Sequence, residues 1–311
     1  MPDCLIITAN AQELAKEIVR RADFPIAIKA CTSAGQALAE YTDESVIFGN
    51  PDMIAEVLPK MWAVDWIQST WVGVTPLMAL DQRDYVLTGI KDVFSPQMSE
   101  YVIGYLLAHE LKVVPRADAQ RAHNWYKTYS GTLQGKRLGV MGTGSIGRHI
   151  AKTATHFGVK VRGLSRSGAE SPEFEQVLKV GQLHDFLEDL DYLVAALPQT
   201  SATDKLLDAA ALAKLPAHAY FINIGRSNVV DDEALIDALR NNKLAGAALD
   251  VFNEEPIPRD SPLWDTPNLS ITAHIAAVSH SSLIVPIFVE NYRRYIEEQP
   301  LRYVIDFDAG Y

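Results

Sequence analysis

A chain of 311 residues is about twice the usual size of one domain, so we expect two domains. Because 48% of the residues are hydrophobic, the chain can fill a large core, which excludes an intrinsically disordered protein. The net charge of -11 repels phosphate backbones and no long run of Lys or Arg offsets it, so nucleic acid is not expected as a partner.

The cysteine content and the apolar runs indicate the compartment. Only Cys4 and Cys31 occur, in no metal-ligand spacing and too few for a disulfide framework, which fits a reducing environment. No stretch approaches the roughly 20 apolar residues of a membrane span. No basic leader precedes the first apolar run, so a secretory signal is not expected. We therefore expect a cytoplasmic protein without a membrane partner.

Short apolar runs alternate with helical periodicity in the first third of the chain. Apolar, strand-length runs lie at 4–8, 26–30, 46–49 and 62–68, and helical patterns lie at 11–22, 34–41 and 51–58. Alternation of strands and helices with short connections predicts a parallel sheet.

From Pro96 the pattern predicts one long amphipathic helix that fades near 124–125. A second alternating series follows, with strands at 137–141, 160–164, 192–196, 219–224, 245–251 and 268–272 and helices between several of them, for example at 232–240. Such a series is typical of a doubly wound dinucleotide-binding sheet. A last helix at 283–298 precedes a β-like tail at 301–306, which we expect to return to the first unit.

A glycine-rich loop follows the predicted strand at 137–141. The segment Gly142-Thr143-Gly144-Ser145-Ile146-Gly147 has the spacing G-x-G-x-x-G between a strand and a helix. Gly142 would permit a tight turn, Gly144 would let the backbone approach a pyrophosphate, and Gly147 would let helix and strand pack closely. The helix start would offer N–H groups to the phosphates. Glycine turns are common, so it is the flanking elements that favour dinucleotide binding.

The next strand ends in Ser165-Arg166-Ser167, where NAD-binding proteins usually carry an acid for the ribose hydroxyls. No carboxylate stands there to repel a 2′-phosphate, and Arg166 offers it a charge-assisted contact. This segment predicts that NADPH is preferred, with NADH also possible. The alternative is a solvated loop arginine.

Arg226, Glu255 and His274 each follow a predicted strand of the second series. Because ligands bind beyond the carboxyl ends of parallel strands, we expect these side chains to converge on one cleft. Each residue alone is ambiguous, since a histidine after a strand is more often structural and an arginine in a turn is usually solvated. The combination favours a functional site.

With these motifs the sequence resembles the D-isomer-specific 2-hydroxyacid dehydrogenase family over nearly the whole chain, most densely from 135 to 277. The resemblance rests on residues 142–147, Leu197-Pro198-Gln199-Thr200, Asn223-Ile224-Gly225-Arg226, 244–252, Glu254-Glu255-Pro256, Pro262-Leu263-Trp264, Pro267-Asn268 and His274. It implies an α/β fold of two doubly wound parallel-sheet domains, with a Rossmann-type cofactor domain inserted in a flavodoxin-like substrate domain. The implied boundaries are 1–98 and 281–311 for the substrate domain and 99–280 for the cofactor domain.

The resemblance also implies the chemistry. The family's catalytic arginine, glutamate and histidine fall on Arg226, Glu255 and His274. Arg226 would bind the carboxylate of a 2-keto acid and polarise its carbonyl. His274 would donate a proton to the carbonyl oxygen while the nicotinamide delivers hydride to carbon, and Glu255 would orient the imidazole and keep it charged near neutral pH.

Further contacts are expected around this centre. Cofactor contacts are expected from Gly142, Gly144, Ser145, Ile146, Gly147, Ser165, Arg166, Ser167, Pro198, Thr200, Ile224 and Asp250, and substrate contacts from Trp71, Val72, Gly73 and Arg226. The backbone N–H groups of Val72 and Gly73 match the loop that meets the substrate carboxylate. Three positions have plain structural alternatives: Trp71 as ordinary packing, Thr200 as a turn residue and Asp250 as the cap of a turn.

Reduction of glyoxylate or hydroxypyruvate is the expected activity, with a small 2-keto or 2-hydroxy acid as the molecular partner. Val72 and Ala273 stand where the family often has alanine and proline, and Val72 would narrow the pocket. A homodimer gripped through the cofactor domain is implied, with an apolar helix near 101–107 as its support; burial of that helix within the monomer is the alternative. The alternative function is a catalytically weak NAD(P)-sensing scaffold that binds partner proteins, which binding without turnover would favour.

Overall fold

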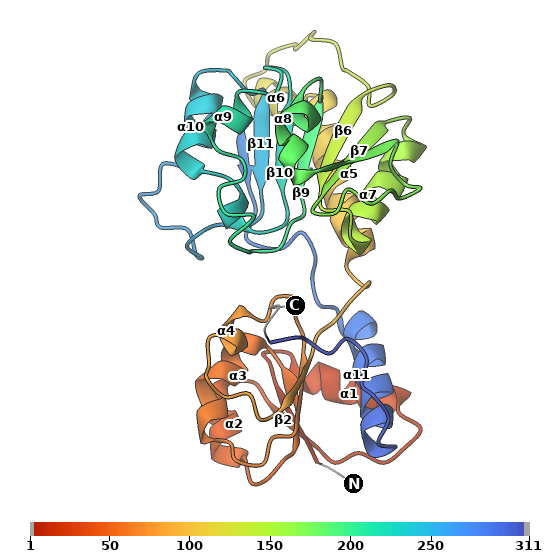
Figure 1. Cartoon of the computed structure of the whole chain (residues 1–311). Helices are drawn as coiled ribbons and strands as arrows, with labels where there is room; N and C mark the ends of the chain where they lie inside the picture. The colour runs from red at the N-terminus through yellow and green to blue at the C-terminus, as the bar shows by residue number, and fades with distance from the viewer. Residues whose placement is uncertain (1–2, 308–311) are drawn as a thin grey trace. The chain divides into compact units, whose positions relative to one another are not determined.

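The computed structural model describes residues 3–307, and the chain divides into two compact units (Figure 1). Unit 1 comprises Met1–Val93 and Ser279–Tyr311, and unit 2 comprises Phe94–Val278. These bounds precede the predicted boundaries by a few residues, because Ser95–Glu110 forms one uninterrupted helix that packs within unit 2.

Unit 1 is built on a five-stranded parallel sheet in the flavodoxin-like order β2-β1-β3-β4-β5. Its strands are β1 (Cys4–Ile7), β2 (Ile28–Cys31), β3 (Val46–Gly49), β4 (Trp66–Ser69) and β5 (Val86–Thr88). Its helices are α1 (Ala11–Arg21), α2 (Ala34–Glu40), α3 (Pro51–Val57), the 3₁₀ turn η1 (Leu58–Lys60), α4 (Thr75–Met78) and α11 (Ser281–Ile296). Helices α1 and α11 pack together on one face, and α2, α3 and α4 cover the other (Figure 1).

Both faces of this sheet are buried, which explains the continuous apolar runs of its strands. Leu5 and Ile7 of β1 belong to the core beneath α2, α3 and α4. On the opposite face Phe48 of β3 and Trp66 of β4 stack on Phe288 of α11, with ring centroids 4.5 and 5.6 Å apart. The alternation of side chains along each strand therefore serves two cores.

Unit 2 is built on a seven-stranded parallel sheet in the order β12-β11-β10-β9-β6-β7-β8, the Rossmann arrangement with one additional strand. Its strands are β6 (Arg137–Met141), β7 (Lys160–Ser165), β8 (Gln176–Lys179), β9 (Tyr192–Ala195), β10 (Tyr220–Asn223), β11 (Gly246–Leu249) and β12 (Leu269–Ile271). Its helices are α5 (Ser95–Glu110), α6 (Val113–Arg121), α7 (Ser145–His156), α8 (Leu183–Leu187), α9 (Ala209–Leu212) and α10 (Asp232–Arg240), with 3₁₀ turns η2 (Val180–Gln182) and η3 (Ser227–Val229). The predicted fold class is thus confirmed.

Two cores flank this second sheet. Helices α5 and α7 pack over one face, and α8, α9 and α10 over the other. Because all neighbouring strands are parallel, their carboxyl ends meet at one edge of the sheet, and the loops that follow β6, β7, β10, β11 and β12 start there. This edge carries the predicted site residues of unit 2.

The β-like tail returns to unit 1, as predicted. The N–H of Ile305 donates to the Leu87 carbonyl at 2.8 Å, and the N–H of Gly89 donates to the Tyr303 carbonyl at 2.9 Å. Thr88 and Val304 form an antiparallel bridge. The tail therefore pairs with the edge strand β5 and covers its free side.

The single long helix predicted from Pro96 to residues 124–125 is wrong. Helix α5 ends at Glu110 and α6 begins at Val113, because Lys112 between them adopts a left-handed conformation with φ of 53°. The strands β5 and β8 were not predicted. Among the described residues, no helix combines the length and apolar character that crossing a bilayer requires.

Candidate functional site

The glycine-rich loop leads from β6 directly into α7, as its spacing predicts. Gly142 has a φ of 102°, and a Cβ there would approach the Ala196 carbonyl oxygen to 2.6 Å. A Cβ at Gly147 would overlap the carbonyl oxygen of Gly142, so only glycine fits where the helix meets the strand. A Cβ on Gly144 would instead meet no atom within 4 Å. The space over Gly144 is therefore open to a ligand that approaches the backbone.

The start of α7 adds donors to this loop. Gly144 is the N-cap residue and no side chain caps the helix. The N–H groups of Ser145, Ile146 and Gly147 lie in the first turn, where the helix itself provides no acceptors. Such N–H groups, together with the positive end of the helix, suit the diphosphate of a dinucleotide. The loop thus fits the cofactor that its sequence predicts.

The end of β7 presents a free cation. Arg166 is exposed, and its guanidinium has no partner among residues 3–307. The hydroxyl oxygens of Ser165 and Ser167 accept hydrogen bonds from the N–H groups of Gly168 and Ala169 at 3.0 and 3.2 Å. The serines therefore shape the turn, and Arg166 is available to an anionic group.

His274 and Glu255 form a hydrogen-bonded pair. The Nδ1 atom of His274 lies 2.9 Å from Oε2 of Glu255. An ionised carboxylate only accepts hydrogen bonds, so Nδ1 is the donor and Nε2 is left for another molecule. The second carboxylate oxygen of Glu255 accepts the N–H of Phe252 at 2.9 Å, which fixes its orientation. The side chains of His274 and Glu255 are 51% and 37% exposed, so a small molecule can reach the pair.

Arg226 follows β10 in a turn that Asn223 shapes. The buried Asn223 donates from Nδ2 to the Arg226 carbonyl at 3.0 Å and accepts the N–H of Gly225 at 3.1 Å. The Arg226 guanidinium donates to the Gly225 carbonyl at 2.8 Å. Burial lowers the pKa of Arg226, and the charge of Glu255 opposes this shift. Glu255 is therefore a neighbour of both Arg226 and His274, and the structure brings these three side chains together.

A buried aspartate holds the turn that carries His274. His274 has a φ of 54°, and its N–H donates to the Asp250 carbonyl at 2.8 Å. The Asp250 carboxylate accepts the N–H groups of Ile275 and Ala276 at 2.8 and 2.9 Å and the Thr272 hydroxyl at 2.5 Å. Both carboxylate oxygens are thus used within the protein. The hydrogen bonds of the Asp250 carboxylate are those of a residue that caps a turn, which was one of its two interpretations from the sequence.

Tyr101 of α5 extends this network. Its hydroxyl lies 2.8 Å from Oγ1 of Thr272, and burial raises the pKa of Tyr101, which keeps the hydroxyl protonated. Sequence reasoning assigned no site role to Tyr101, Thr272 or Asn223. Because 171 positions separate Tyr101 from Thr272, no local pattern could have linked them.

The loops after β9 and β10 contain three further residues predicted to contact the cofactor, Pro198, Thr200 and Ile224. Thr200 lies in a turn that Thr203 closes, because the N–H of Thr200 donates to the Thr203 hydroxyl at 2.9 Å. That hydroxyl donates in turn to the Pro198 carbonyl at 2.8 Å. Ile224 is buried and belongs to the core under α5 and α7, against which Ile146 also packs. Thr200 therefore has the turn role that was its alternative, and Ile224 and Ile146 shape the loop from beneath.

The predicted substrate loop follows β4 in unit 1. The Ser69 hydroxyl accepts the N–H of Trp71 at 2.9 Å and donates to its carbonyl at 2.7 Å, which holds the loop in a tight bend. Within the described part of the chain, no hydrogen bond is recorded for the N–H groups of Val72 and Gly73. Free N–H groups of this kind suit a carboxylate.

Comparison with known proteins identifies the relatives of this chain. The profile described as "D-isomer specific 2-hydroxyacid dehydrogenase, NAD binding domain" matches residues 103–276. Glyoxylate/hydroxypyruvate reductase B of Escherichia fergusonii is 32% identical over 238 residues, which cover 74% of this chain and 73% of that protein.

Two solved structures extend the similarity to the whole chain. A D-isomer specific 2-hydroxyacid dehydrogenase family protein of Aeromonas salmonicida superposes with a TM-score of 0.95 at 37% identity, covering 99% of this chain and 100% of that one. The NADPH-dependent glyoxylate/hydroxypyruvate reductase of Sinorhizobium meliloti, in complex with NADP and sulfate, superposes with a TM-score of 0.85 at 25% identity, with coverage of 99% and 100%.

Proposed function

Since the chain belongs to the D-isomer specific 2-hydroxyacid dehydrogenase family, we propose that it reduces glyoxylate or hydroxypyruvate to the corresponding 2-hydroxy acid with NADPH. The pair of His274 and Glu255 is the observation that carries this proposal, because it presents an oriented proton donor beside the guanidinium of Arg226. The names of the curated relatives and the NADP bound to the Sinorhizobium meliloti reductase support the substrate and the cofactor. A binding scaffold without catalysis is not favoured.

Each residue of the proposed site has its own role in binding the substrate or in transferring the proton. Arg226 binds the substrate carboxylate through its two-pronged guanidinium and polarises the adjacent carbonyl. His274 gives its Nε2 proton to the carbonyl oxygen, where negative charge develops, and Glu255 holds the imidazole through Nδ1. We assign the free N–H groups of Val72 and Gly73 in unit 1 to a carboxylate. NADPH, when bound, supplies the hydride for the carbonyl carbon.

The cofactor is held by backbone more than by side chains. We assign the diphosphate to the N–H groups of Ser145, Ile146 and Gly147 above the open space at Gly144. The 2′-phosphate of the adenosine ribose is assigned to Arg166, whose guanidinium is unpaired within residues 3–307. Of the remaining predicted cofactor residues, Pro198 and Thr200 belong to the turn after β9 that Thr203 closes.

The substrate assignment is tested by a steady-state screen of 2-keto acids with NADPH. We expect kcat/KM to be highest for glyoxylate and hydroxypyruvate and to fall for bulkier acids such as phenylpyruvate. The valine side chain at position 72, where the family often has alanine, would leave less room for a bulky substrate. If only bulky acids were turned over, the assignment of glyoxylate and hydroxypyruvate as substrates would be wrong. NADPH binding without turnover of any 2-keto acid would instead support the scaffold.

Replacing Arg166 with glutamine tests the cofactor assignment. We expect the wild-type protein to show a kcat/KM with NADPH at least about tenfold above that with NADH, and Arg166→Gln to remove most of this difference, since one charge-assisted hydrogen bond contributes about 1.5–3 kcal/mol. The value with NADH serves as the internal control and should not change. A tenfold preference of the wild type for NADH would refute the assignment.

Replacing Glu255 with glutamine tests the pairing with His274. Without the carboxylate the imidazole loses the acceptor that fixes the N–H at Nδ1 and the orientation of the ring, so kcat should fall while the Kd for NADPH stays close to that of the wild type. Glu254→Gln, which neutralises the exposed neighbouring carboxylate, should leave kcat in place. An unchanged kcat in Glu255→Gln would argue that the pair does not orient His274.

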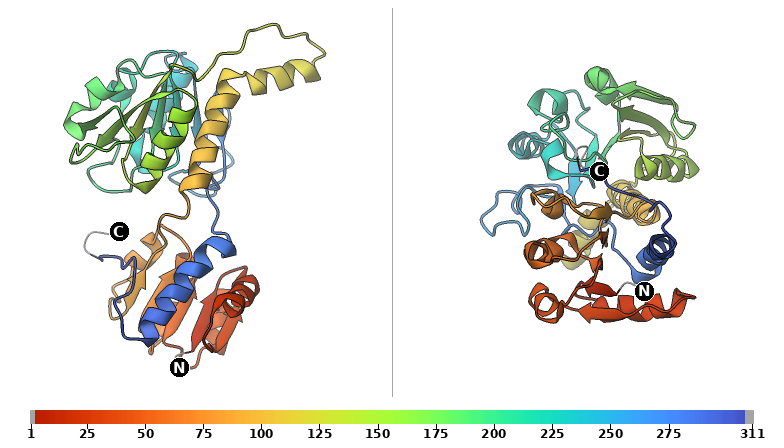
Figure 2. Two further views of the ribbon diagram at one scale, coloured as in Figure 1. Left: turned by 90° about the vertical axis from the view of Figure 1, so that its right-hand side faces the viewer. Right: turned by 60° about the horizontal axis from the view of Figure 1, so that its bottom comes forward.

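We further propose that the protein is a homodimer formed through unit 2. The apolar helix near 101–107 does not support this, because Val102, Ile103 and Leu106 are buried in the core of unit 2 itself. The support comes instead from α6 and the segment that follows it, which project from the body of unit 2 (Figure 2, left). There Trp125 and Tyr129 are 84% and 93% exposed. Val113 and Val114 of α6 are exposed as well, and exposed apolar side chains gathered in one segment are typical of a surface that another molecule covers.

The double variant Trp125→Ser/Tyr129→Ser is expected to sediment as a monomer where the wild type sediments as a dimer, because loss of two aromatic anchors typically removes several kcal/mol of association free energy. Trp62→Ser, which removes an exposed tryptophan from unit 1, should leave the dimer intact. A double variant with unchanged sedimentation would remove this segment from the interface.

The cytoplasm is the compartment we propose. Cys4 and Cys31 are both free and buried. Burial raises the pKa of Cys31 to about 11, so the group remains a thiol at neutral pH. Two unpaired thiols persist most readily in a reducing compartment.

A further inference from the structure

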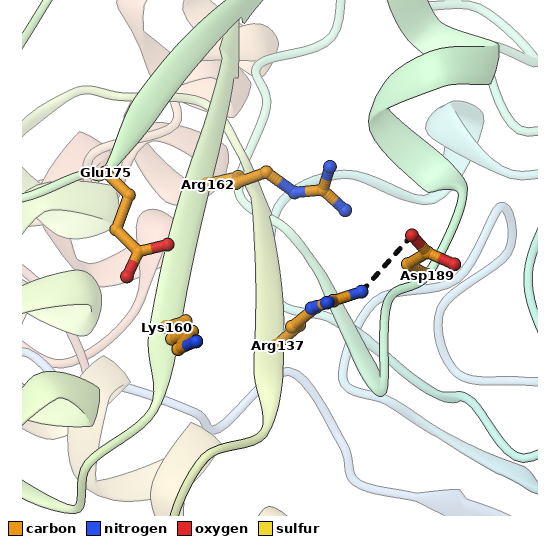
Figure 3. A pocket seen from close by; sticks show the side chains of 5 residues that line it. All are labelled: Arg137, Lys160, Arg162, Glu175 and Asp189. Atoms are coloured by element: carbon orange, nitrogen blue, oxygen red, sulfur yellow. Dashed lines mark ion pairs between the residues drawn. The ribbon is translucent and has the colours of Figure 1, made fainter.

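A second cluster of charged side chains lies at the opposite end of the strands that carry the glycine-rich loop. A cavity of about 300 Å³ opens at the amino ends of β6 and β7 and is lined by Arg137, Lys160, Arg162, Glu175 and Asp189 (Figure 3). Arg137 is the first residue of β6, and the loop with Gly142 begins after its last residue. At about 3.3 Å per residue the two ends of β6 are roughly 13 Å apart, so one small ligand cannot occupy both sites.

Strand register places the three cations together. Arg137 is the partner of Lys160 in the pairing of β6 with β7. Lys160 and Arg162 are two residues apart on one strand and therefore point to the same face. The residue opposite Arg162 is Gly139, and the space where its side chain would lie is filled by Leu190 and Phe186. The apolar side chains of Leu190 and Phe186 therefore lie beside Arg162, with Lys160 two residues before it on β7 and Arg137 diagonally across on β6.

The acidic residues of the cavity do not neutralise this cluster. Arg137 forms an ion pair with Asp189 at 3.2 Å, while the Arg162 guanidinium donates only to the Glu188 carbonyl at 2.7 Å. Within residues 3–307, neither Lys160 nor Arg162 has a carboxylate at ion-pair distance. Figure 3 shows the two guanidinium groups on the side of Asp189 and the Glu175 carboxylate apart from them. Three cations against two carboxylates leave one positive charge in excess, in a chain whose net charge is -11.

The environment of Arg162 is unfavourable without an added anion. Burial and the neighbouring charge of Arg137 both lower the pKa of Arg162, and the charges of Asp189 and Glu175 oppose this shift only in part. An oxyanion between the three cations would replace this repulsion with charge-assisted hydrogen bonds. The planar guanidinium offers two parallel donors to such a group, and the ammonium of Lys160 adds a point charge.

We propose that this cavity binds a phosphate group, held by Arg162, Lys160 and Arg137, at a site separate from the cofactor and the catalytic residues. The group is either free inorganic phosphate or the phosphate of a small phosphorylated metabolite, and the volume of about 300 Å³ admits both. Because β6 and β7 connect this cavity with the glycine-rich loop and with Arg166, the ligand would stabilise the strands that position the cofactor.

The test is calorimetric titration of the NADPH-saturated protein, in which the phosphate sites of the cofactor are already filled. Inorganic phosphate and glycerol 3-phosphate are titrated separately, with sodium chloride of equal ionic strength as the control for screening. We expect saturable binding of at least one of the two. Binding of inorganic phosphate alone identifies the free ion as the ligand, and tighter binding of glycerol 3-phosphate identifies a phosphorylated metabolite.

Lys160→Gln and Arg162→Gln should each weaken this binding about tenfold or more, since each removes a charge-assisted contact. Lys160 is exposed, so its substitution keeps the test valid should Arg162→Gln fail to fold. Lys60→Gln, which removes an exposed cation from unit 1, should have no effect. The proposal is overturned by absence of binding for both phosphates, by equal effects of chloride, or by unchanged affinity in both cavity variants.

Discussion

His274→Ala is expected to lower kcat for reduction of glyoxylate by about 10²–10⁴-fold, the contribution typical of a positioned general acid. The imidazole is the group whose Nδ1 is held by Glu255, and its Nε2 is left for the carbonyl oxygen. Since within residues 3–307 no hydrogen bond or ion pair joins the glycine-rich loop or Arg166 to this pair, the Kd for NADPH should stay close to that of the wild type. A loss of kcat without loss of cofactor affinity separates catalysis from binding.

The structure also provides a rescue and a control for this variant. The His274 side chain is half exposed, so added imidazole can reach the space that the alanine leaves and should raise turnover in proportion to its concentration. His156→Ala removes an exposed imidazole from the end of α7 and should leave kcat unchanged. Turnover of His274→Ala near the wild-type value would end the assignment of His274 as the proton donor.

Arg226→Gln is expected to lower kcat/KM for the keto acid by about 10²–10³-fold, the loss found when one preorganised donor is removed from a developing oxyanion. Burial destabilises the charged form of the guanidinium, and the charge of Glu255 opposes this effect. A bound substrate carboxylate would stabilise the charged form further. Within residues 3–307 the guanidinium donates to the adjacent Gly225 carbonyl, so the substitution should change the free energy of unfolding little.

Arg226→Lys refines this expectation. Lysine keeps the charge but lacks the two parallel donors of arginine, so its kcat/KM should lie between those of Arg226→Gln and the wild type. Arg240→Gln, which removes an exposed arginine from the end of α10, is the matched control. If both Arg226 variants kept the KM and kcat of the wild type, the substrate carboxylate would have to be bound elsewhere.

The fold could be predicted where its strands are buried and apolar on both faces. The runs that became β1, β3, β6 and β9 are of this kind. The edge strand β8, Gln176–Lys179, is polar at both ends and gave no such signal. The end of the helix before Lys112 could not be predicted, because a left-handed backbone is usually marked by glycine and here the residue is lysine. Local periodicity thus revealed the core strands but not the edges and corners, which tertiary contacts determine.

The site could be predicted where residues stand in fixed spacing after a strand. Gly142, Gly144 and Gly147 have the surroundings that their spacing requires, and His274 meets Glu255. The role of Tyr101 could not be predicted, because Tyr101 reaches Thr272 from helix α5 across 171 positions of sequence, whereas capping of a turn was one of the two interpretations of Asp250. Sequence patterns identify the reacting groups, whereas their supports depend on contacts that only the folded chain creates.

The imidazole beside Glu255 delivers the proton if NADPH-dependent reduction of a small keto acid depends on His274. This dependence is measured by the oxidation of NADPH on addition of glyoxylate, followed in parallel for the wild type and His274→Ala at equal cofactor saturation. We expect steady turnover by the wild type and a loss of at least about 10²-fold in the variant. Equal rates for the two proteins, or no turnover by a wild type that binds NADPH, would contradict it.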